Sequence, residues 1–178
     1  MNRKLGVRTV KLETTRFGEI DIKESELIVM KGPILGFEHL SRFVLLIHNN
    51  NTPLWWLQSV EDPSIAFVVI NPRIIRPDYN PAIFEEDLES VDIKNSNDIA
   101  LLAIVTVRSQ PFRVTANIRA PILINAETRM ARQVVLDDPD YPIQYDVLDH
   151  KADVNESLSE TGGVWTEWAS RLAPQAVV

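Results

Sequence analysis

The chain has 178 residues, no cysteine and a formal net charge of −7. Hydrophobic residues make up 45% of it and charged residues 24%, values typical of one soluble globular domain and not of a disordered chain. The absence of cysteine excludes disulfides, thiolate catalysis and cysteine-based zinc sites. No apolar run is long enough to cross a bilayer, and the first residues do not form a signal peptide, so we expect a soluble protein that is not exported.

Charge is unevenly distributed along the chain. Residues 61–98 contain nine carboxylates and three basic side chains, whereas residues 99–135 contain five arginines and a single carboxylate, Glu127. A solvated charged face is the simpler interpretation of each segment, and a docking surface is the alternative. Direct binding to nucleic acid is disfavoured, because contacts with phosphate groups need a basic surface.

The first strands are predicted from alternating apolar and polar residues. Residues 9–22 have the pattern of a half-exposed hairpin that turns at Arg16-Phe17-Gly18. Short strands are expected at 27–30 and 43–47, on either side of a turn at 32–37 whose glycines permit positive φ angles. The side chains of the first hairpin that should point toward the core are Val10, Leu12, Ile20 and Ile22.

Residues 54–72 predict the central hairpin of the fold. Two apolar runs of strand length, one with Trp55 and Leu57 and the other with Phe67, flank the sequence Glu61-Asp62-Pro63-Ser64. Proline removes a donor from the strand ladder, while aspartate and serine bond to nearby main chain, so the chain turns there. We expect Leu57 and Phe67 to be structural residues on opposing strands.

The second half of the chain predicts one short helix and several further strands. After a proline-rich bend at 76–81, Asn80 is the expected N-cap and Pro81 the first helical residue, with acidic residues near the positive end of the helix dipole. Strands are expected at 99–107, 112–118, 122–125 and 133–136. The predicted fold is therefore mainly β: a small antiparallel β-barrel-like domain with one short helix and a C-terminal extension.

The domain boundary is predicted near residue 145, where the strand pattern stops. Residues 1–145 should form the barrel-like domain and fold alone, and residues 146–178 form an acidic extension. Trp165, Trp168 and Leu172 share one face of a possible short helix in this extension. This face could pack on its own domain, dock on a partner, or belong to a frayed tail.

No catalytic or metal-binding motif is present. The sequence has no nucleophile elbow, phosphate-binding loop, dinucleotide fingerprint or zinc-protease motif, and its three histidines share no ligand spacing. Residues 137–140 contain three carboxylates but lack the alternation and glycine of a calcium loop, so a turn is favoured. We expect no metal and no cofactor.

Two other functional classes remain open at this stage. A small-molecule-binding barrel would need converging polar side chains, for which the candidates are Gln58, Thr106, Thr115 and Asn117. A barrel that binds single-stranded nucleic acid would use the arginine-rich strands, where Phe112 beside Arg113 gives slight support.

Four short motifs carry a family resemblance. They are LQS (Leu57, Gln58, Ser59), PDY (Pro77, Asp78, Tyr79), TAN (Thr115, Ala116, Asn117) and AP…N (Ala120, Pro121, Asn125). On these motifs and their order, residues 9–141 resemble the flagellar assembly factor FliW, a family of small bacterial β-barrel-like proteins. The turn at Gly32 departs from the family pattern by displacing its first glycine, and residues 142–178 extend beyond the usual end of the family.

The resemblance implies a cytoplasmic, non-enzymatic protein with two partners, flagellin and the translational regulator CsrA. Binding CsrA would relieve its repression of flagellin translation, and exchange between the partners would give feedback. No contact with a membrane or with nucleic acid is expected. Exposed polar or amphipathic groups on loops are the preferred contact candidates, although simple capping and solvation would also explain them; they are Asp78, Tyr79, Glu85, Glu86, Asp137 and Asp138.

Overall fold

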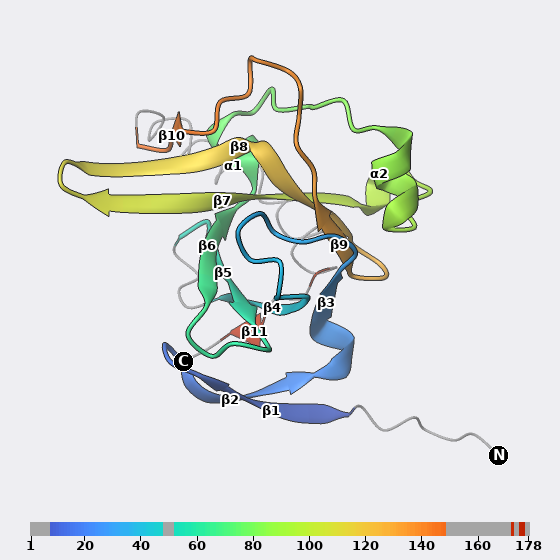
Figure 1. The fold of residues 1–178 in the computed structure, drawn as a ribbon, viewed down its shortest axis with the longest axis vertical. Coiled ribbons are helices and arrows are strands. Elements are labelled where there is room, and N and C mark those ends of the chain that lie inside the picture. The colour runs from blue at the N-terminus through green and yellow to red at the C-terminus, as the bar shows by residue number, and fades with distance from the viewer. Residues whose placement is uncertain (1–7, 48–51, 149–171, 173–174, 177–178) are drawn as a thin grey trace.

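β-strands dominate the computed structural model, which describes residues 8–47, 52–148, 172 and 175–176 (Figure 1). The elements, in chain order, are β1 (Thr9–Thr14), β2 (Gly18–Lys23), the 3-10 helix Glu24–Glu26, β3 (Leu27–Met30), β4 (Arg42–Ile47), β5 (Leu54–Ser59), β6 (Ala66–Ile70), α1 (Pro72–Ile75), α2 (Glu85–Ser90), the 3-10 helix Ser96–Asp98, β7 (Ile99–Ser109), β8 (Phe112–Asn125), β9 (Met130–Gln133), β10 (Tyr145–Asp146) and β11 (Gln175–Ala176).

Strand pairing closes a ring. Its order is β8-β7-β6-β5-β4-β3-β9, and β9 then pairs with β8 again. Every pairing in the ring is antiparallel except β3 with β9, which is parallel and sets Val29 opposite Met130. The predicted mainly β, barrel-like fold is confirmed, and closure leaves no free sheet edge within the ring, where one would otherwise invite aggregation.

An apolar cluster fills the ring, because alternate residues of every strand in it point to the same side. Leu57 is fully buried there and lies opposite Phe67 in the β5–β6 register, as predicted. The buried members of the cluster are Ile28, Met30, Ile34, Leu40, Phe43, Leu45, Trp55, Leu57, Val69, Ala100, Leu102, Ile122, Ile124, Ala126, Ala131 and Leu172.

Two further clusters cover the outer faces of the sheet. The β1–β2 hairpin packs Leu12, Ile20 and Ile22 against β4. Val10, predicted to point inward, is 42% exposed, because the hairpin contacts the sheet through β2 and the half of β1 nearest the turn. On the other side, α1 and the segments that follow α1 and β9 cover the outer face of β7 and β8.

The predicted helix begins at the wrong residue, and a second helix, α1, was not predicted. Asn80 and Pro81 lie in irregular chain, and α2 begins only after Phe84. The chain is held before α2 because the Arg73 Nε donates a 3.1 Å hydrogen bond to the carbonyl of Tyr79. The same Asn-Pro capping signal does operate earlier, where the side chain of Asn71 accepts a hydrogen bond from the main-chain nitrogen of Arg73 at the start of α1.

Two strand boundaries also differ from the prediction. The expected strands at 112–118 and 122–125 form one long strand, β8, whose register with β7 shifts between Leu102 and Ile104. The expected strand at 133–136 lies instead at Met130–Gln133. The turn before β4 does use a glycine for its positive φ angle, which is 84° at Gly36.

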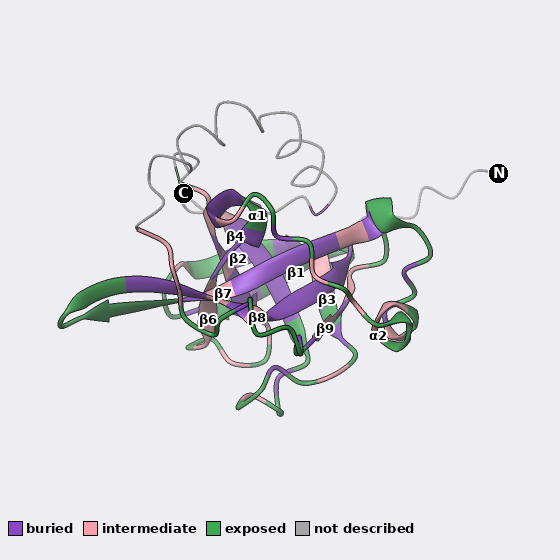
Figure 2. Cartoon of the chain, turned by 90° about the horizontal axis from the view of Figure 1, so that it is seen from above, coloured by how far each residue is buried: buried purple, intermediate pink, exposed green. Residues whose placement is uncertain are grey.

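β7 and β8 extend beyond the ring as a projecting hairpin with an exposed end (Figure 2). We call residues 106–113 the arm; each of them is exposed. The other end of the chain returns to the ring: Leu172 joins the apolar cluster, and β11 pairs in parallel with Leu46 and Ile47 of β4. Trp165 and Trp168 lie outside the described residues.

In the described part of the chain, no helix is long and apolar enough to cross a membrane.

Candidate interaction surface

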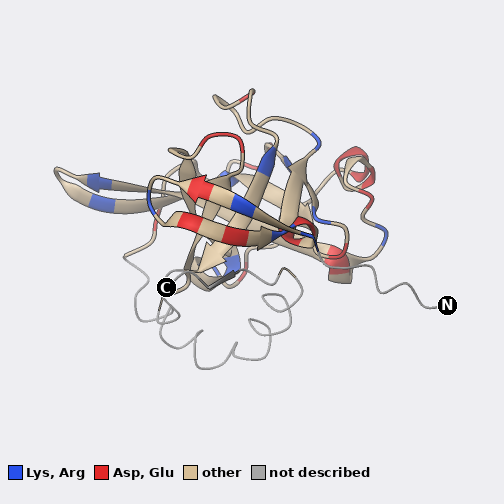
Figure 3. Cartoon of the chain, turned by 90° about the horizontal axis from the view of Figure 1, so that it is seen from below, with Lys and Arg blue, Asp and Glu red and all other residues tan. Residues whose placement is uncertain are grey.

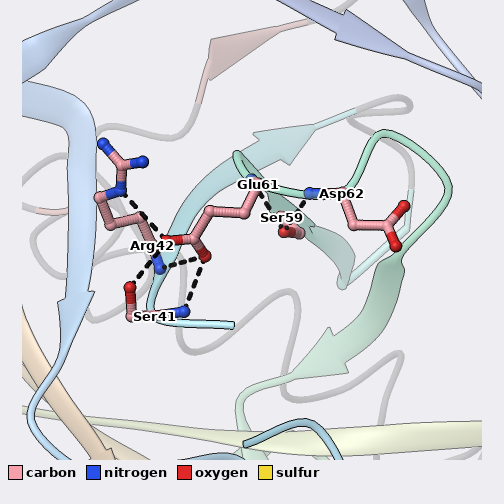
Figure 4. A network of polar contacts seen from close by, with 5 residues as sticks. All are labelled: Ser41, Arg42, Ser59, Glu61 and Asp62. Carbon is pink, nitrogen blue, oxygen red and sulfur yellow. Dashed lines mark hydrogen bonds and ion pairs between the residues drawn. The ribbon is translucent and has the colours of Figure 1, made fainter. Parts of the chain in front are cut away.

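The LQS motif builds the turn of the central hairpin. The Gln58 side-chain nitrogen donates hydrogen bonds of 3.0 Å to the carbonyls of Ser59 and Ile65. The Ser59 hydroxyl oxygen accepts hydrogen bonds from the main-chain nitrogens of Glu61 and Asp62, at 3.1 and 3.0 Å (Figure 4). With Leu57 in the core, all three motif residues therefore have structural roles.

Glu61 joins this turn to the start of β4. Its carboxylate accepts hydrogen bonds from the main-chain nitrogen and hydroxyl of Ser41, both at 2.7 Å, and from the main-chain nitrogen and Nε of Arg42, at 3.1 and 3.2 Å (Figure 4). Partial burial opposes ionisation, but these hydrogen bonds from Ser41 and Arg42 outweigh it and lower the pKa of Glu61 to about 2. The ionised carboxylate thus fixes the loop between β5 and β6 to the preceding segment.

Tyr79 is buried, so its predicted accessibility was wrong. Its side chain is 1% exposed, its hydroxyl donates a 2.8 Å hydrogen bond to the carbonyl of Ile118, and its ring meets that of Tyr141 edge-on at 4.8 Å. Burial, reinforced by Tyr141, raises the pKa of the Tyr79 hydroxyl. A side chain enclosed in this way anchors the proline-rich bend and does not contact a partner in this conformation.

Arg76 brings two of the predicted contact segments together. Its Nε donates to the carboxylate of Asp78 at 3.2 Å, and its Nη1 donates to the carbonyl of Asp140 at 2.7 Å. Asp78 therefore lies beside the turn that carries Asp137 and Asp138, and all three carboxylates are exposed as predicted. Their role as partner contacts stays a prediction.

Glu85 and Glu86 form a separate acidic surface on α2. Both are exposed, and the neighbouring Asp87 pairs with Arg132 of β9 at 3.3 Å, which fixes the helix to the barrel. Figure 3 shows acidic residues gathered over α2 and basic residues on the arm. The predicted contacts thus occupy two places, one at the bend and one at α2, and their function there stays a prediction.

The remaining motifs are structural as well. The Asn117 side-chain oxygen accepts a 3.0 Å hydrogen bond from the main-chain nitrogen of Ala120, inside the stretch where β8 shifts register. The Asn125 amide donates to the carbonyls of Val91 and Asp92, and its oxygen accepts from two nitrogens of the following turn. Thr115, Ala116, Ala120 and Pro121 are buried in β8. These contacts give the motif residues structural roles in the fold.

A groove that the sequence patterns did not reveal lies beside the arm. Its volume is about 710 Å³, and its walls come from the turn before β4, from β6, from both strands of the projecting hairpin and from the segment before β10. Three of the polar side chains proposed for a small-molecule site, Thr106, Thr115 and Asn117, line this open groove, and Gln58 lines a smaller neighbouring pocket of about 350 Å³. The groove forms where β6 and β7 separate in space. The sequence of apolar and polar residues along each strand contains no signal for such a separation.

Among the described residues, no three histidine or carboxylate side chains gather closely enough to hold a metal ion. The carboxylates of residues 137–140 instead shape a turn, in which Asp138 accepts a 2.9 Å hydrogen bond from the main-chain nitrogen of Asp140.

Comparison with known proteins gives the family. Residues 11–147 match the family model described as FliW protein. The chain belongs to this family. It is 46% identical over 142 residues to the flagellar assembly factor FliW of Syntrophus aciditrophicus, an alignment that covers 80% of this chain and 90% of the relative. It is 40% identical over 139 residues to the flagellar assembly factor FliW of Geobacter sulfurreducens, an alignment that covers 78% of this chain and 87% of the relative.

The fold agrees with a solved member of the family. A crystal structure of the flagellar assembly factor FliW superposes with a TM-score of 0.72 at 34% identity, covering 80% of this chain and 99% of that chain. The resemblance stated from the four motifs is confirmed, and the family assigns this chain to flagellar assembly. The matched segment ends at Val147, so the extension that supplies Leu172 and β11 lies outside it.

Proposed function

We propose that this chain acts in the cytoplasm as a non-enzymatic flagellar assembly factor that binds flagellin and the translational regulator CsrA. Binding CsrA relieves its repression of flagellin translation, and flagellin competes for the factor. The observation that carries the proposal is the match to flagellar assembly factors over 80% of the chain, at up to 46% identity.

The distribution of exposed charge supports binding to a basic partner surface. The chain has a net charge of −7, and two of its acidic surfaces, Glu85 with Glu86 and Asp78 with Asp137 and Asp138, project from short, well-anchored segments. Negative surface charge speeds encounter with a basic partner, and the effect weakens as salt is added.

Exchange between the partners is the most specific part of the proposal. A stable interface takes about 800 Å² from each protein, so the accessible surface of 10548 Å² has room for two such interfaces. Exchange therefore requires that the two surfaces overlap or that occupancy of one weakens the other. By linkage, each partner must then weaken the binding of the other by the same factor.

Titration calorimetry with purified flagellin and CsrA tests the function. Each protein is expected to bind the full chain, and flagellin added to a preformed complex with CsrA is expected to release CsrA. A stable ternary complex with unchanged affinities would rule out the exchange. Absence of binding to both proteins would overturn the proposed function.

Charge reversal separates the two acidic surfaces. The variants Glu85→Lys with Glu86→Lys, and Asp137→Lys with Asp138→Lys, are each expected to weaken at least one partner. Glu13→Lys, on the exposed face of β1, is the matched control and should leave both affinities unchanged. If both double variants bind like the unmodified chain, these acidic surfaces are not the contacts.

A further inference from the structure

The projecting part of β7 has a strand edge with no neighbour. β6 pairs with β7 only as far as Val105, and β7 continues through Thr106 to Ser109 without β6 beside it. These last residues of β7 are exposed and pair only with β8 on their other side. An exposed edge presents unused main-chain donors and acceptors, which is the structural requirement for adding a further strand.

The opposite edge of the projecting hairpin is already occupied. β10 pairs with Thr115 and Ala116 of β8, and the main-chain nitrogen of Val147 donates a 2.9 Å hydrogen bond to the carbonyl of Val114. Arg113 also pairs with Asp146 at 3.4 Å. Only Phe112 and Arg113 of β8 extend beyond β10 on that edge, so the longer free edge of the hairpin is that of β7, on the side of the groove.

The groove beside that edge has an apolar wall. Phe37 and Phe67 meet edge-on at 4.8 Å on its inner side. Leu35, Val107 and Ile143 also line it and are exposed by 61%, 56% and 57%. Large apolar side chains that gather in one concave surface suit the apolar side chains of a bound segment.

The charges of the groove are all positive, in contrast to the net charge of the chain. Arg16 and Arg108 line it and no carboxylate does. Arg16 lies over the ring of Trp56 at 4.3 Å, which holds its guanidinium in place, and neither arginine forms an ion pair with a described carboxylate. The groove is therefore complementary to a segment that carries carboxylates.

A buried acceptor lies next to the groove. The pocket of about 350 Å³ beside it shares Arg16 and Ala66 with the groove and is lined by Gln58. Donation from its side-chain nitrogen to surrounding carbonyls fixes the orientation of the Gln58 amide, and its oxygen has no hydrogen-bond partner although the residue is fully buried. This oxygen is enclosed, so a segment in the groove does not contact it.

From these features we propose that the groove binds an extended segment of a partner protein, with alternating apolar and acidic residues, that adds as a strand to the free edge of β7. Main-chain hydrogen bonds to Thr106–Ser109 supply affinity, the apolar wall receives alternate side chains, and Arg16 and Arg108 select carboxylates. The proposal concerns the surface and the chemistry of its ligand, so it stands whether or not flagellin and CsrA are the partners.

Selection from a displayed library of short random peptides against the full chain tests the ligand chemistry. Enriched peptides are expected to alternate apolar and acidic residues. Their affinity for Arg108→Glu should fall about tenfold or more, the change typical of losing a close charge pair. Lys94→Glu reverses an exposed charge that does not line the groove and should leave the affinity unchanged. Arg108→Glu should also retain its melting temperature, because the new carboxylate lies opposite Arg113 in the β7–β8 register.

Methylation of the peptide main chain tests strand addition without altering the protein. Alternate amides of a strand point to opposite sides, so N-methyl groups on one alternate set should abolish binding and those on the other set should be tolerated. Equal loss from both sets indicates a helical or irregular ligand and overturns the proposal. Enrichment of basic peptides, no enrichment at all, or affinities that Arg108→Glu leaves unchanged would overturn it too, as would occupancy of the groove by a single-stranded RNA that displaces the peptide.

Discussion

The hydroxyl group of Tyr79 donates a 2.8 Å hydrogen bond to the main-chain carbonyl of Ile118 and ties the proline-rich bend to β8. Tyr79→Phe keeps the ring against Tyr141 but removes this donor from a buried site. We expect the free energy of unfolding to fall by about 1–2 kcal/mol in urea denaturation, in line with the loss of a buried hydrogen bond.

Tyr141→Phe is the matched control, since no hydrogen bond from its hydroxyl joins it to another described residue. It should change the stability by less than about 0.5 kcal/mol. Equal losses in the two variants would show that the hydrogen bond to Ile118 is not what stabilises the bend.

Leu57→Ala is expected to destabilise the barrel by about 2–5 kcal/mol, because it leaves a cavity in the apolar cluster opposite Phe67. Leu35→Ala removes the same atoms from a side chain that is 61% exposed and should have little effect on the melting temperature. Binding of either partner by Leu57→Ala should change only as far as the folded fraction changes. An unaltered melting temperature in Leu57→Ala would contradict the assignment of Leu57 to the core of the central hairpin.

Glu61→Gln should make stability depend less on pH. The folded pKa of Glu61 is about 2, below its ordinary value of 4.5, so the ionised form stabilises the fold above pH 4.5 and this contribution is lost as the pH falls toward 2. The chain should be more stable than Glu61→Gln at neutral pH, and the difference should shrink through that acidic range. Melting temperatures across the range measure this.

Glu127→Gln is the control, because Glu127 is exposed and lies outside the hydrogen-bond network of Glu61. The difference in melting temperature between Glu127→Gln and the unmodified chain should not shrink in this way as the pH falls. A difference for Glu61→Gln that stays constant from neutral pH to about 2 would refute the role assigned to this carboxylate.

A chain that ends at Tyr145 is predicted to fold cooperatively, since the ring closes at β9, before the extension begins. The truncated chain should nevertheless be less stable, because it lacks Leu172, which lies in the apolar cluster. The truncated chain should lose about 2–5 kcal/mol, and Leu172→Ala in the full chain should reproduce most of the loss. Loss of a cooperative transition would place the domain boundary after residue 145, whereas an unchanged stability in Leu172→Ala would show that its contacts contribute little.

Strands were predictable wherever one face of the strand is buried along its length. The burial of successive side chains is a local property that the sequence pattern shows directly. The structure confirms the strands predicted from the alternation in 9–22 and from the apolar runs around Leu57 and Phe67. Val10 belongs to the same alternating pattern and is nevertheless exposed. How far along β1 the hairpin contacts β4 depends on three-dimensional packing, which the pattern does not show.

Positions set by distant contacts were not predictable. Tyr79 stands among prolines and polar residues that suggest an exposed bend, but its partner Ile118 is 39 residues further along the chain. The start of α2 differs from the prediction for the same reason, since the anchored Tyr79 holds Asn80 and Pro81 outside the helix. For the contact candidates, exposure was predicted for all six side chains and is found for five of them. The groove beside β7 was not predicted, because it arises from two strands that separate in space.

The parallel pairing of β3 with β9 sets the order in which this protein can fold during its synthesis. β3 leaves the ribosome early, whereas its partner Met130–Gln133 is made only near the end of the family segment. Until then the outer edge of β3 has no neighbour, and contacts this distant in sequence form slowly. The nascent protein therefore depends on the late arrival of β9 to protect that edge, and its first hundred or so residues should need shielding from other chains.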